Sequence, residues 1–423
     1  MTTATLDDEV RLLETNWFMS YPHDVYTRLR REAPVYWSER DGLWAVSRYD
    51  DVRFVSKSPD RFANAYHVYV AAASVQDDGR PSTDELGLPR RAQLRKIDGL
   101  GPLHVDNLVM ADGERHTFLR KIASYAFTPK AIGALEDQVK QIASELFDEI
   151  PDEVEVDFID TVAAPLPMIM IALMLGVPRE HLDTFRVWSD AFIEMSDESF
   201  HDRVESRIEQ VLEFREYFKD QLRDRAAHPR DDLLTKLAEA QWNGEPLTLE
   251  EQLSMAQILL IAGNETTRGL IAGAGLALSE HPDQRRILVE DPGLMPGAVE
   301  EFLRYVTPVT HMCRTALDDV ELRGQRIAKG DFLCLLYAAA NRDEEVWDRA
   351  DELNVTRTPD PAHVAFGFAE HFCLGANLAR REARIVLSEL LARFPNYEIV
   401  GPHTRTRQHM TPGIKTMPVV FHR

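Results

Sequence analysis

The chain has 423 residues, 44% hydrophobic and 28% charged, which is the composition of an ordinary globular protein. This length allows either two domains or one large fold. The net charge of −22 argues against nucleic acid and anionic membranes as partners, because both are polyanions. The three cysteines, Cys313, Cys334 and Cys373, are too few for a disulfide framework and fit a reducing compartment.

The apolar stretches of the chain do not predict a membrane protein. The first ten residues are acidic and polar and lack the apolar core of a secretory signal. Of two apolar stretches, 166–177 is short and contains Pro167, and 255–278 carries Glu265 and Arg268 near its centre. Both predict buried helices. We therefore expect a cytoplasmic protein that binds no membrane.

Short elements are predicted at the start of the chain, followed by a long segment without periodicity. An amphipathic helix is expected over 24–32, and two strands, 35–37 and 44–47, flank a turn at Asp41-Gly42. From 63 to 107 no pattern remains. A segment of this length is seldom idle in a compact domain, so it predicts a lid or binding loop, with a disordered excursion as the alternative.

Helical periodicity dominates from Arg115 to about Thr307. Thr128-Pro129 precedes a helix predicted over 130–150, and Thr248 and Glu251 form a capping-box pattern before a long apolar helix, about 253–279. At 1.5 Å per residue that helix would run about 40 Å and cross the whole molecule.

Strand-like runs come from both ends of the chain, so the predicted fold class is mainly α with a small β portion. The β-rich portion is expected from about 33–48, 309–336 and 397–423, with early strands pairing with late ones. We therefore predict one domain spanning 1–423.

Cys373 lies just before a predicted helix, 374–393. Unsatisfied N–H groups and the positive end of the helix dipole lower a thiol's pKa and favour thiolate there. Gly375 allows backbone N–H groups to approach the sulfur, and Phe366 supplies an aromatic wall against water. A lone cysteine is more often a free core thiol, whereas a shielded thiolate suits an axial ligand of haem iron.

The segment 366–375, Phe-Gly-Phe-Ala-Glu-His-Phe-Cys-Leu-Gly, resembles the haem-binding signature of the cytochrome P-450 family. The resemblance implies a cytochrome P-450 fold, with haem b between a long central helix and the helix after the Cys loop. Cys373 would ligate the iron, Phe366 and Gly375 would contact the cofactor, and His371 would meet a propionate. Ala369 departs from the family, which most often has Gly where a tight bend is needed; we expect a slightly shifted loop that still binds haem.

The segment Ala262-Gly263-Asn264-Glu265-Thr266-Thr267 falls within the long apolar helix, where a carboxylate demands a reason. Ala262 and Gly263 leave room for a flat ligand and oxygen, while Thr266 can bond back to the helix and open a groove. The segment resembles the acid–alcohol pair of the family. The resemblance implies that Thr266 hydrogen-bonds the oxygen being activated and that Glu265 relays protons. The alternative is a threonine that bends the helix beside a solvated glutamate.

Cationic side chains elsewhere predict a clamp for the haem propionates. His116 and Arg120 stand at i and i+4, on one face of a helix. With Arg314 and His371 they make four donors for two carboxylates. The segments around His116 and Arg314 resemble family segments; alone, each residue would be a surface charge.

Glu301 and Arg304 share a helix face at i and i+3 and resemble the structural Glu-x-x-Arg of the family. The resemblance implies a buried ion pair that supports folding and haem incorporation, with Arg357 completing the network. His311 is expected to be a pocket-edge histidine, and Cys313 and Cys334 to be unreactive thiols.

The resemblance implies a haem-thiolate monooxygenase that inserts one atom of dioxygen into a lipophilic small molecule by hydroxylation, epoxidation or dealkylation. Electrons would come from an external ferredoxin and its reductase. A basic docking patch is predicted from Lys121, Arg380, Arg381 and Arg384, with solvated helix charges as the alternative. Competing functions are a peroxide-driven peroxygenase and a haem-binding carrier or sensor without turnover.

Pocket walls are expected from five segments by the same resemblance. They are 63–107, 188–195, 258–262, 309–312 and 410–413. Because most of these residues outside the long loop are apolar, we expect a terpenoid, steroid or polyketide-like substrate.

Overall fold

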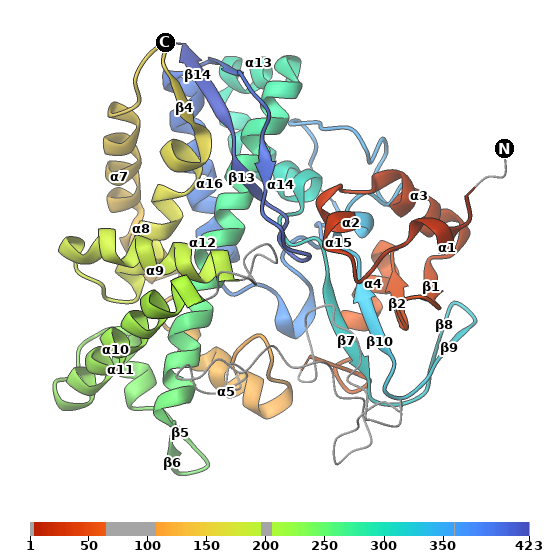
Figure 1. Cartoon of the computed structure of the whole chain (residues 1–423), viewed down its shortest axis with the longest axis horizontal. Coiled ribbons are helices and arrows are strands. Elements are labelled where there is room, and N and C mark those ends of the chain that lie inside the picture. Colours follow the sequence, from red (N-terminus) through yellow and green to blue (C-terminus); the bar gives the residue numbers. More distant parts are fainter. Residues whose placement is uncertain (1–3, 65–106, 196–204, 359, 423) are drawn as a thin grey trace.

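The computed structural model describes residues 4–64, 107–195, 205–358 and 360–422 (Figure 1). The helices are α1 Leu6–Glu9, α2 Thr15–Met19, α3 His23–Glu32, α4 Tyr49–Ser56, α5 Gly113–Ser124, α6 Pro129–Ala134, α7 Glu136–Asp148, α8 Pro165–Met174, α9 Leu182–Met195, α10 Glu205–Ala227, α11 Leu233–Ala238, α12 Leu249–Glu280, α13 Pro282–Glu290, α14 Met295–Val306, α15 Tyr337–Ala340 and α16 Ala376–Arg393. The strands are β1 Val35–Ser38, β2 Leu43–Val46, β3 Phe62–Ala63, β4 Glu155–Asp157, β5 Gln241–Trp242, β6 Glu245–Pro246, β7 Met312–Ala316, β8 Val320–Leu322, β9 Gln325–Ile327, β10 Phe332–Leu335, β11 Asn396–Ile399, β12 Thr404–Arg405, β13 Ile414–Thr416 and β14 Pro418–His422.

The main sheet joins strands from distant parts of the sequence. Its order is β1-β2-β10-β7-β3, and β2 pairs in parallel with β10 through Ala45 and Cys334. A second sheet, β11-β14-β4, joins the C-terminus to the middle of the chain. The predicted pairing of early with late strands is thus confirmed, and the single-domain organisation stays a prediction.

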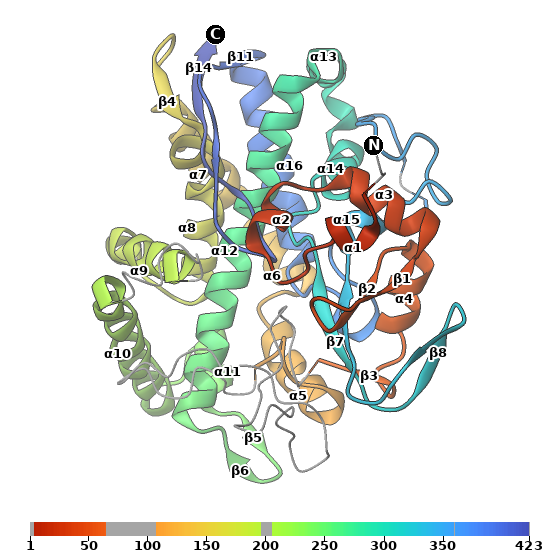
Figure 2. The same ribbon diagram turned by 45° about the vertical axis from the view of Figure 1, so that its right-hand side comes forward.

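Helix α12 runs through the middle of the molecule, with the main sheet on one side and α9 and α10 on the other (Figure 1). Its start is fixed by the predicted capping box, in which Thr248 accepts from the Glu251 N–H and Glu251 accepts from the Thr248 N–H. Helix α16 packs against it, as the view turned by 45° also shows (Figure 2). The predicted long central helix is therefore confirmed.

Packing between the central helices depends on glycines. A Cβ on Gly275 would lie 2.4 Å from the Phe158 ring, and one on Gly273 would lie 2.4 Å from Val306. Neighbouring side chains thus occupy the space that larger residues would need. The first half of α12 contributes to one hydrophobic cluster and its second half to another.

Several predicted helix boundaries differ from those in the structure. The helix expected over 130–150 is two helices, α6 and α7, separated at Leu135; Gly133 weakens helix formation just before this break. The helix expected from Leu374 begins at Ala376, with Gly375 as its N-cap. The long loop expected over 63–107 lies almost wholly outside the described residues. Within the described part of the chain, no helix is long and apolar enough to span a membrane.

Candidate functional site

The loop that carries Cys373 closes on itself through backbone hydrogen bonds. The Cys373 N–H donates to the Phe366 carbonyl at 2.8 Å, which joins the two ends of the loop. Gly367 and Ala369 take left-handed backbone conformations, with φ of +70° and +60°. The bend predicted at 369 is therefore present, and an alanine occupies a conformation that favours glycine.

The Cys373 side chain is exposed, although much protein surrounds its sulfur. This surrounding protein raises the pKa of the Cys373 thiol, while the Gly375 N–H and the charges of Arg120 and Arg380 act in the opposite direction. The expected N–H donation and positive charge are thus present. The prediction of a net lowered pKa was wrong for the protein alone, because desolvation is the larger effect.

Helix α5 brings two predicted propionate donors to the Cys loop. Arg120 Nη2 donates to the Phe372 carbonyl at 2.8 Å, and the His116 ring lies 4.2 Å from the His371 ring, centroid to centroid. His116 is 2% exposed, and its Nε2 has no hydrogen-bond partner among the described residues. Burial, followed by the charges of His371 and Arg120, lowers the pKa of His116 to about 4.

His371 is held between two carboxylates. Its Nε2 lies 3.3 Å from Asp112 Oδ1 and 3.4 Å from Glu370 Oε1. Ligand atoms of His116, Glu370 and His371 lie within 4.8 Å of one another, a spacing that could also hold a metal ion.

Arg314 is buried on β7. Its Nη1 donates to its neighbour's carbonyl, that of Cys313, at 2.7 Å. A hydrogen bond from Arg314 reaches the Tyr337 hydroxyl, although burial raises the pKa of Tyr337 overall. The Tyr337 hydroxyl would be 3.7 Å from a Cβ on Gly367, so Arg314 lies next to the Cys loop.

This donor set fits haem b. The buried Nε2 of His116 has no hydrogen-bond partner among the described residues, so it could bind a propionate carboxylate. The guanidinium groups of Arg120 and Arg314 suit the same two carboxylates. The Cys373 sulfur, with a backbone N–H donated to it, suits the iron.

The predicted oxygen-side residues lie together on α12. Thr266 Oγ1 donates to the Ala262 carbonyl at 2.8 Å, which is the back-bonding expected of a threonine that opens a helix groove. Ala262 is exposed, whereas its neighbours on α12 are buried or half-buried. Gly263 faces α8, where a Cβ would meet Ile171 at 3.0 Å, so close helix packing explains this glycine. Glu265 is half-buried.

The predicted Glu-x-x-Arg network is confirmed. Arg304 and Glu301 form two hydrogen bonds of 2.8 Å, and both are fully buried. Arg357 Nε donates to Glu301 at 3.2 Å, and Arg304 also donates to the Asn341 and Ala350 carbonyls.

The predicted basic docking patch is largely neutralised by ion pairs. Arg380 donates to Glu300 at 2.6 and 2.9 Å. Burial would raise the pKa of Glu300, but hydrogen bonds from His363 and Arg380 outweigh it and lower the pKa to about 2. Glu136 pairs with Arg381 at 2.5 Å and with Arg384 at 3.5 Å. The four cations therefore do not form a uniform positive surface.

Three of the predicted pocket walls meet at the turn after β12. The Thr310 N–H donates to the Met410 carbonyl at 2.8 Å, and Gln408 Nε2 donates to the Ile193 carbonyl of α9 at 3.2 Å. His311 is fully buried and stacks on Phe18 at 4.1 Å.

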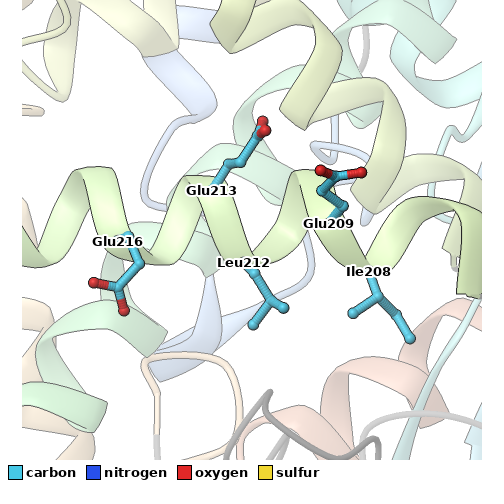
Figure 3. Close-up of a pocket in the computed structure, with 5 residues that line it drawn as sticks. All are labelled: Ile208, Glu209, Leu212, Glu213 and Glu216. Atoms are coloured by element: carbon cyan, nitrogen blue, oxygen red, sulfur yellow. The ribbon is translucent and has the colours of Figure 1, made fainter.

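A hollow of about 510 Å³ lies elsewhere, along α10 (Figure 3). Ile208 and Leu212 point to one side of this helix and Glu209 and Glu213 to the other. None of the predicted cofactor residues lines it. We therefore do not assign it to the active site.

Sequence reasoning missed two residues near the site. Asp112 precedes α5 and looked like an ordinary loop residue, yet it contacts His371. Glu382 lies on α16 among charged residues, but it is 1% exposed and accepts a hydrogen bond from Thr267 of α12. The only signal for Asp112 was its place four residues before His116.

Comparisons with known proteins agree with this geometry. Residues 288–409 match the family model described as Cytochrome P450. The chain is 36% identical over 405 residues to linalool 8-monooxygenase of Pseudomonas putida, covering 95% of each. It superposes on cytochrome P450 CYP109Q5 from Chondromyces apiculatus with a TM-score of 0.79 at 33% identity, covering 96% of each chain. For CYP109E1 from Bacillus megaterium in complex with testosterone, the TM-score is 0.78 at 29% identity, covering 95% of this chain and 99% of that one. The chain therefore belongs to the cytochrome P450 family, whose members are oxygen-incorporating oxidoreductases that bind haem b through a cysteine.

Proposed function

We propose that this chain is a monooxygenase that hydroxylates a lipophilic small molecule, with Cys373 as the iron ligand. The observation that carries the proposal is the closed Cys loop. It presents a thiol to an N–H of Gly375, and it lies against the α5 segment that carries the propionate donors.

His116, Arg120, Arg314 and His371 would hold the propionates, and Phe366 and Gly375 would frame the ring on the Cys side. When bound, haem supplies reductive activation of dioxygen. Phe366 packs at 4.7 Å under the Arg380 guanidinium and at 6.0 Å from Phe372. This packing would keep water away from the sulfur, which favours the thiolate donor that the chemistry needs.

Thr266 and Glu265 would deliver protons on the oxygen side. Because the Thr266 hydroxyl donates its hydrogen to Ala262, its lone pairs are free to accept one from a neighbouring donor. Glu265 precedes Thr266 on the same helix turn and would relay protons from solvent toward the Thr266 hydroxyl, acting as a general acid. The role of Ala262, which is exposed, would be to leave space beside this groove, whereas Gly263 packs against Ile171 of α8.

The proposed substrate is a hydrocarbon-rich molecule such as a terpenoid, steroid or polyketide-like compound. Walls from α9, 309–312 and 410–413 adjoin one another through the Gln408 and Thr310 hydrogen bonds. The name of the Pseudomonas putida relative specifies linalool, and the CYP109E1 structure contains testosterone, so both handle lipophilic compounds.

Electrons would reach the haem from an external partner of ferredoxin type. Lys121, which lies on α5 and is exposed, remains a candidate contact for it. The ion pairs of Arg380, Arg381 and Arg384 weaken the rest of the predicted patch, so we expect modest dependence of turnover on salt. All three cysteines are free, which accords with the cytoplasmic setting that we propose.

The substitution Thr266→Ala tests the proton-delivery assignment. With a substrate that shifts the haem spectrum, the variant should still consume reductant, while product per reductant falls about tenfold or more and hydrogen peroxide accumulates. Thr267→Ala is the matched control, because the Thr267 hydroxyl hydrogen-bonds Glu382 of α16. In this variant the amount of product formed per reductant consumed should match that of wild type. Unchanged product yield in Thr266→Ala would refute the assignment.

The same preparation separates the monooxygenase from a peroxygenase. We expect turnover with reductant, ferredoxin and dioxygen, and slow turnover with hydrogen peroxide alone. Fast turnover with peroxide that Thr266→Ala leaves unchanged would favour the peroxygenase. Absence of product with both oxidants, across substrates that perturb the spectrum, would favour a carrier or sensor.

A further inference from the structure

Asp112 lies where three segments of the chain meet: the end of β3, the start of α5 and the Cys loop. The Asn64 N–H donates to both carboxylate oxygens of Asp112, at 2.8 and 3.1 Å. Asp112 Oδ1 also lies 3.3 Å from His371 Nε2. The backbone of Asp112 closes the first turn of α5, because the Asp112 carbonyl accepts from the His116 N–H at 3.1 Å.

The side chain of Asp112 does not perform the usual task of an aspartate at this position. An N-cap aspartate ordinarily accepts a hydrogen bond from the second or third N–H of its helix. Asp112 has the backbone of an N-cap, with φ −123° and ψ 168°, yet its side chain makes no such bond. Its carboxylate is directed instead to Asn64 and His371.

The contact with His371 extends to the second histidine. The His371 ring packs against the His116 ring at 4.2 Å with an interplanar angle of 41°. The His116 Nε2 atom is buried and has no hydrogen-bond partner among the described residues. The His371 ring therefore forms part of the surface against which His116 packs, and a change in its orientation would change that contact.

We propose that Asp112 is a positioning residue for the propionate edge of haem, which locks His371, and through it His116, into one arrangement. The inference rests on the proposed function, because it assigns these histidines to the cofactor. Second-layer carboxylates commonly orient histidines that bind a metal or cofactor, and their removal costs about 10–100-fold in affinity. Glu370, at 3.4 Å from the same Nε2, flanks the ring without replacing the link to β3 and α5.

The test compares haem retention and reduction potential in the haem-loaded wild type, Asp112→Ser and Asp112→Asn. Serine is an equally good N-cap but is too short to reach His371. Haem transfer from Asp112→Ser to excess apomyoglobin should be about tenfold faster than from wild type. Its haem potential should shift to a more positive value, because a negative charge near the propionates is lost.

Asp112→Asn keeps an acceptor but loses the charge, and its transfer rate should fall between the two, about threefold above wild type. Thr128→Ala is the matched control, since Thr128 caps α6 by accepting from the Ala131 N–H and contacts no proposed propionate donor. It should change neither haem transfer nor potential.

A transfer rate and potential in Asp112→Ser equal to wild type would overturn the inference, as would equal changes in Thr128→Ala. If Asp112→Ser does not yield folded protein, Asp112→Asn decides, and a rate equal to wild type then overturns it. Failure of the wild type to bind haem with a thiolate spectrum would instead refute the proposed function.

Discussion

Ala369 shows how one residue can depart from a family pattern and still keep the backbone that the pattern requires. Its φ of +60° is the conformation for which the family most often uses glycine. An L-residue there costs about 1–2 kcal/mol, and the closed hydrogen bonds of the Cys loop hold it in place. The sequence predicted the bend because the motif is local.

Ala369→Gly should therefore stabilise the protein. Relief of the strained φ outweighs the larger entropy of an unfolded glycine, for a net gain of about 0.5–1 kcal/mol. Urea unfolding would measure it. Gly367→Ala is the reverse control, since φ there is +70°, and it should lose about 1 kcal/mol. A less stable Ala369→Gly would show that the loop has no strain to relieve.

Glu382 is the residue whose behaviour the sequence concealed most fully. It follows Arg380 and Arg381, so it looked like part of a charged, solvated face. Packing of α16 against α12 buries it, and that tertiary contact has no local signal. Burial raises the pKa of Glu382 to about 8, against the lowering effect of the Thr267 hydroxyl.

The buried Glu382 makes the stability of the folded protein depend on pH. Between the unfolded pKa of about 4.3 and the folded pKa of about 8, the native state binds the extra proton, so this group's contribution to stability falls as pH rises. Glu382→Gln should remove the effect. Its stability relative to wild type should rise with pH across this window by up to about 1.4 kcal/mol per unit, as measured by urea unfolding at pH 5, 6.5 and 8. A difference independent of pH would contradict the buried, protonated state.

At the scale of elements, α12 was the most predictable part of the fold. Its capping box and long apolar run fixed its start to within four residues, from Leu253 expected to Leu249 observed. The break between α6 and α7 was missed, because helical periodicity continues across Leu135. Gly263 was expected beside the cofactor, and its contact with Ile171 depends on how α8 crosses α12, which periodicity does not specify.

Gly275→Ala should destabilise the protein through the crossing of α12 with Phe158. The new methyl group would lie 2.4 Å from the ring, and such overpacking costs about 1–3 kcal/mol, more than the helix gains from alanine. Gly269→Ala is the control on the same helix. There the nearest atom would be Pro308 Cβ at 3.7 Å, so it should be neutral or gain up to about 1 kcal/mol. Thermal unfolding of both variants would decide, and equal effects would contradict the packing account.

At the scale of the whole molecule, the sequence motifs are far apart along the chain, and the fold brings several of them together. Arg357 reaches Glu301 across 56 positions, and Arg120 reaches the Phe372 carbonyl across 252. The family resemblance gave the roles that we propose for these residues. The resemblance did not predict a role for Asp112. Its contact with His371 joins positions 259 apart, and nothing in the Cys-loop motif points to residue 112.

The absorption spectrum of the reduced, carbon-monoxide-bound protein tests the central claim most directly. Wild-type protein should show the red-shifted Soret band of thiolate-ligated haem. Cys373→His should bind haem but lose that band, and Cys334→Ala, which changes a fully buried thiol of β10, should keep it. Absence of the band in wild type, or its persistence in Cys373→His, would contradict the assignment of Cys373 as the haem ligand.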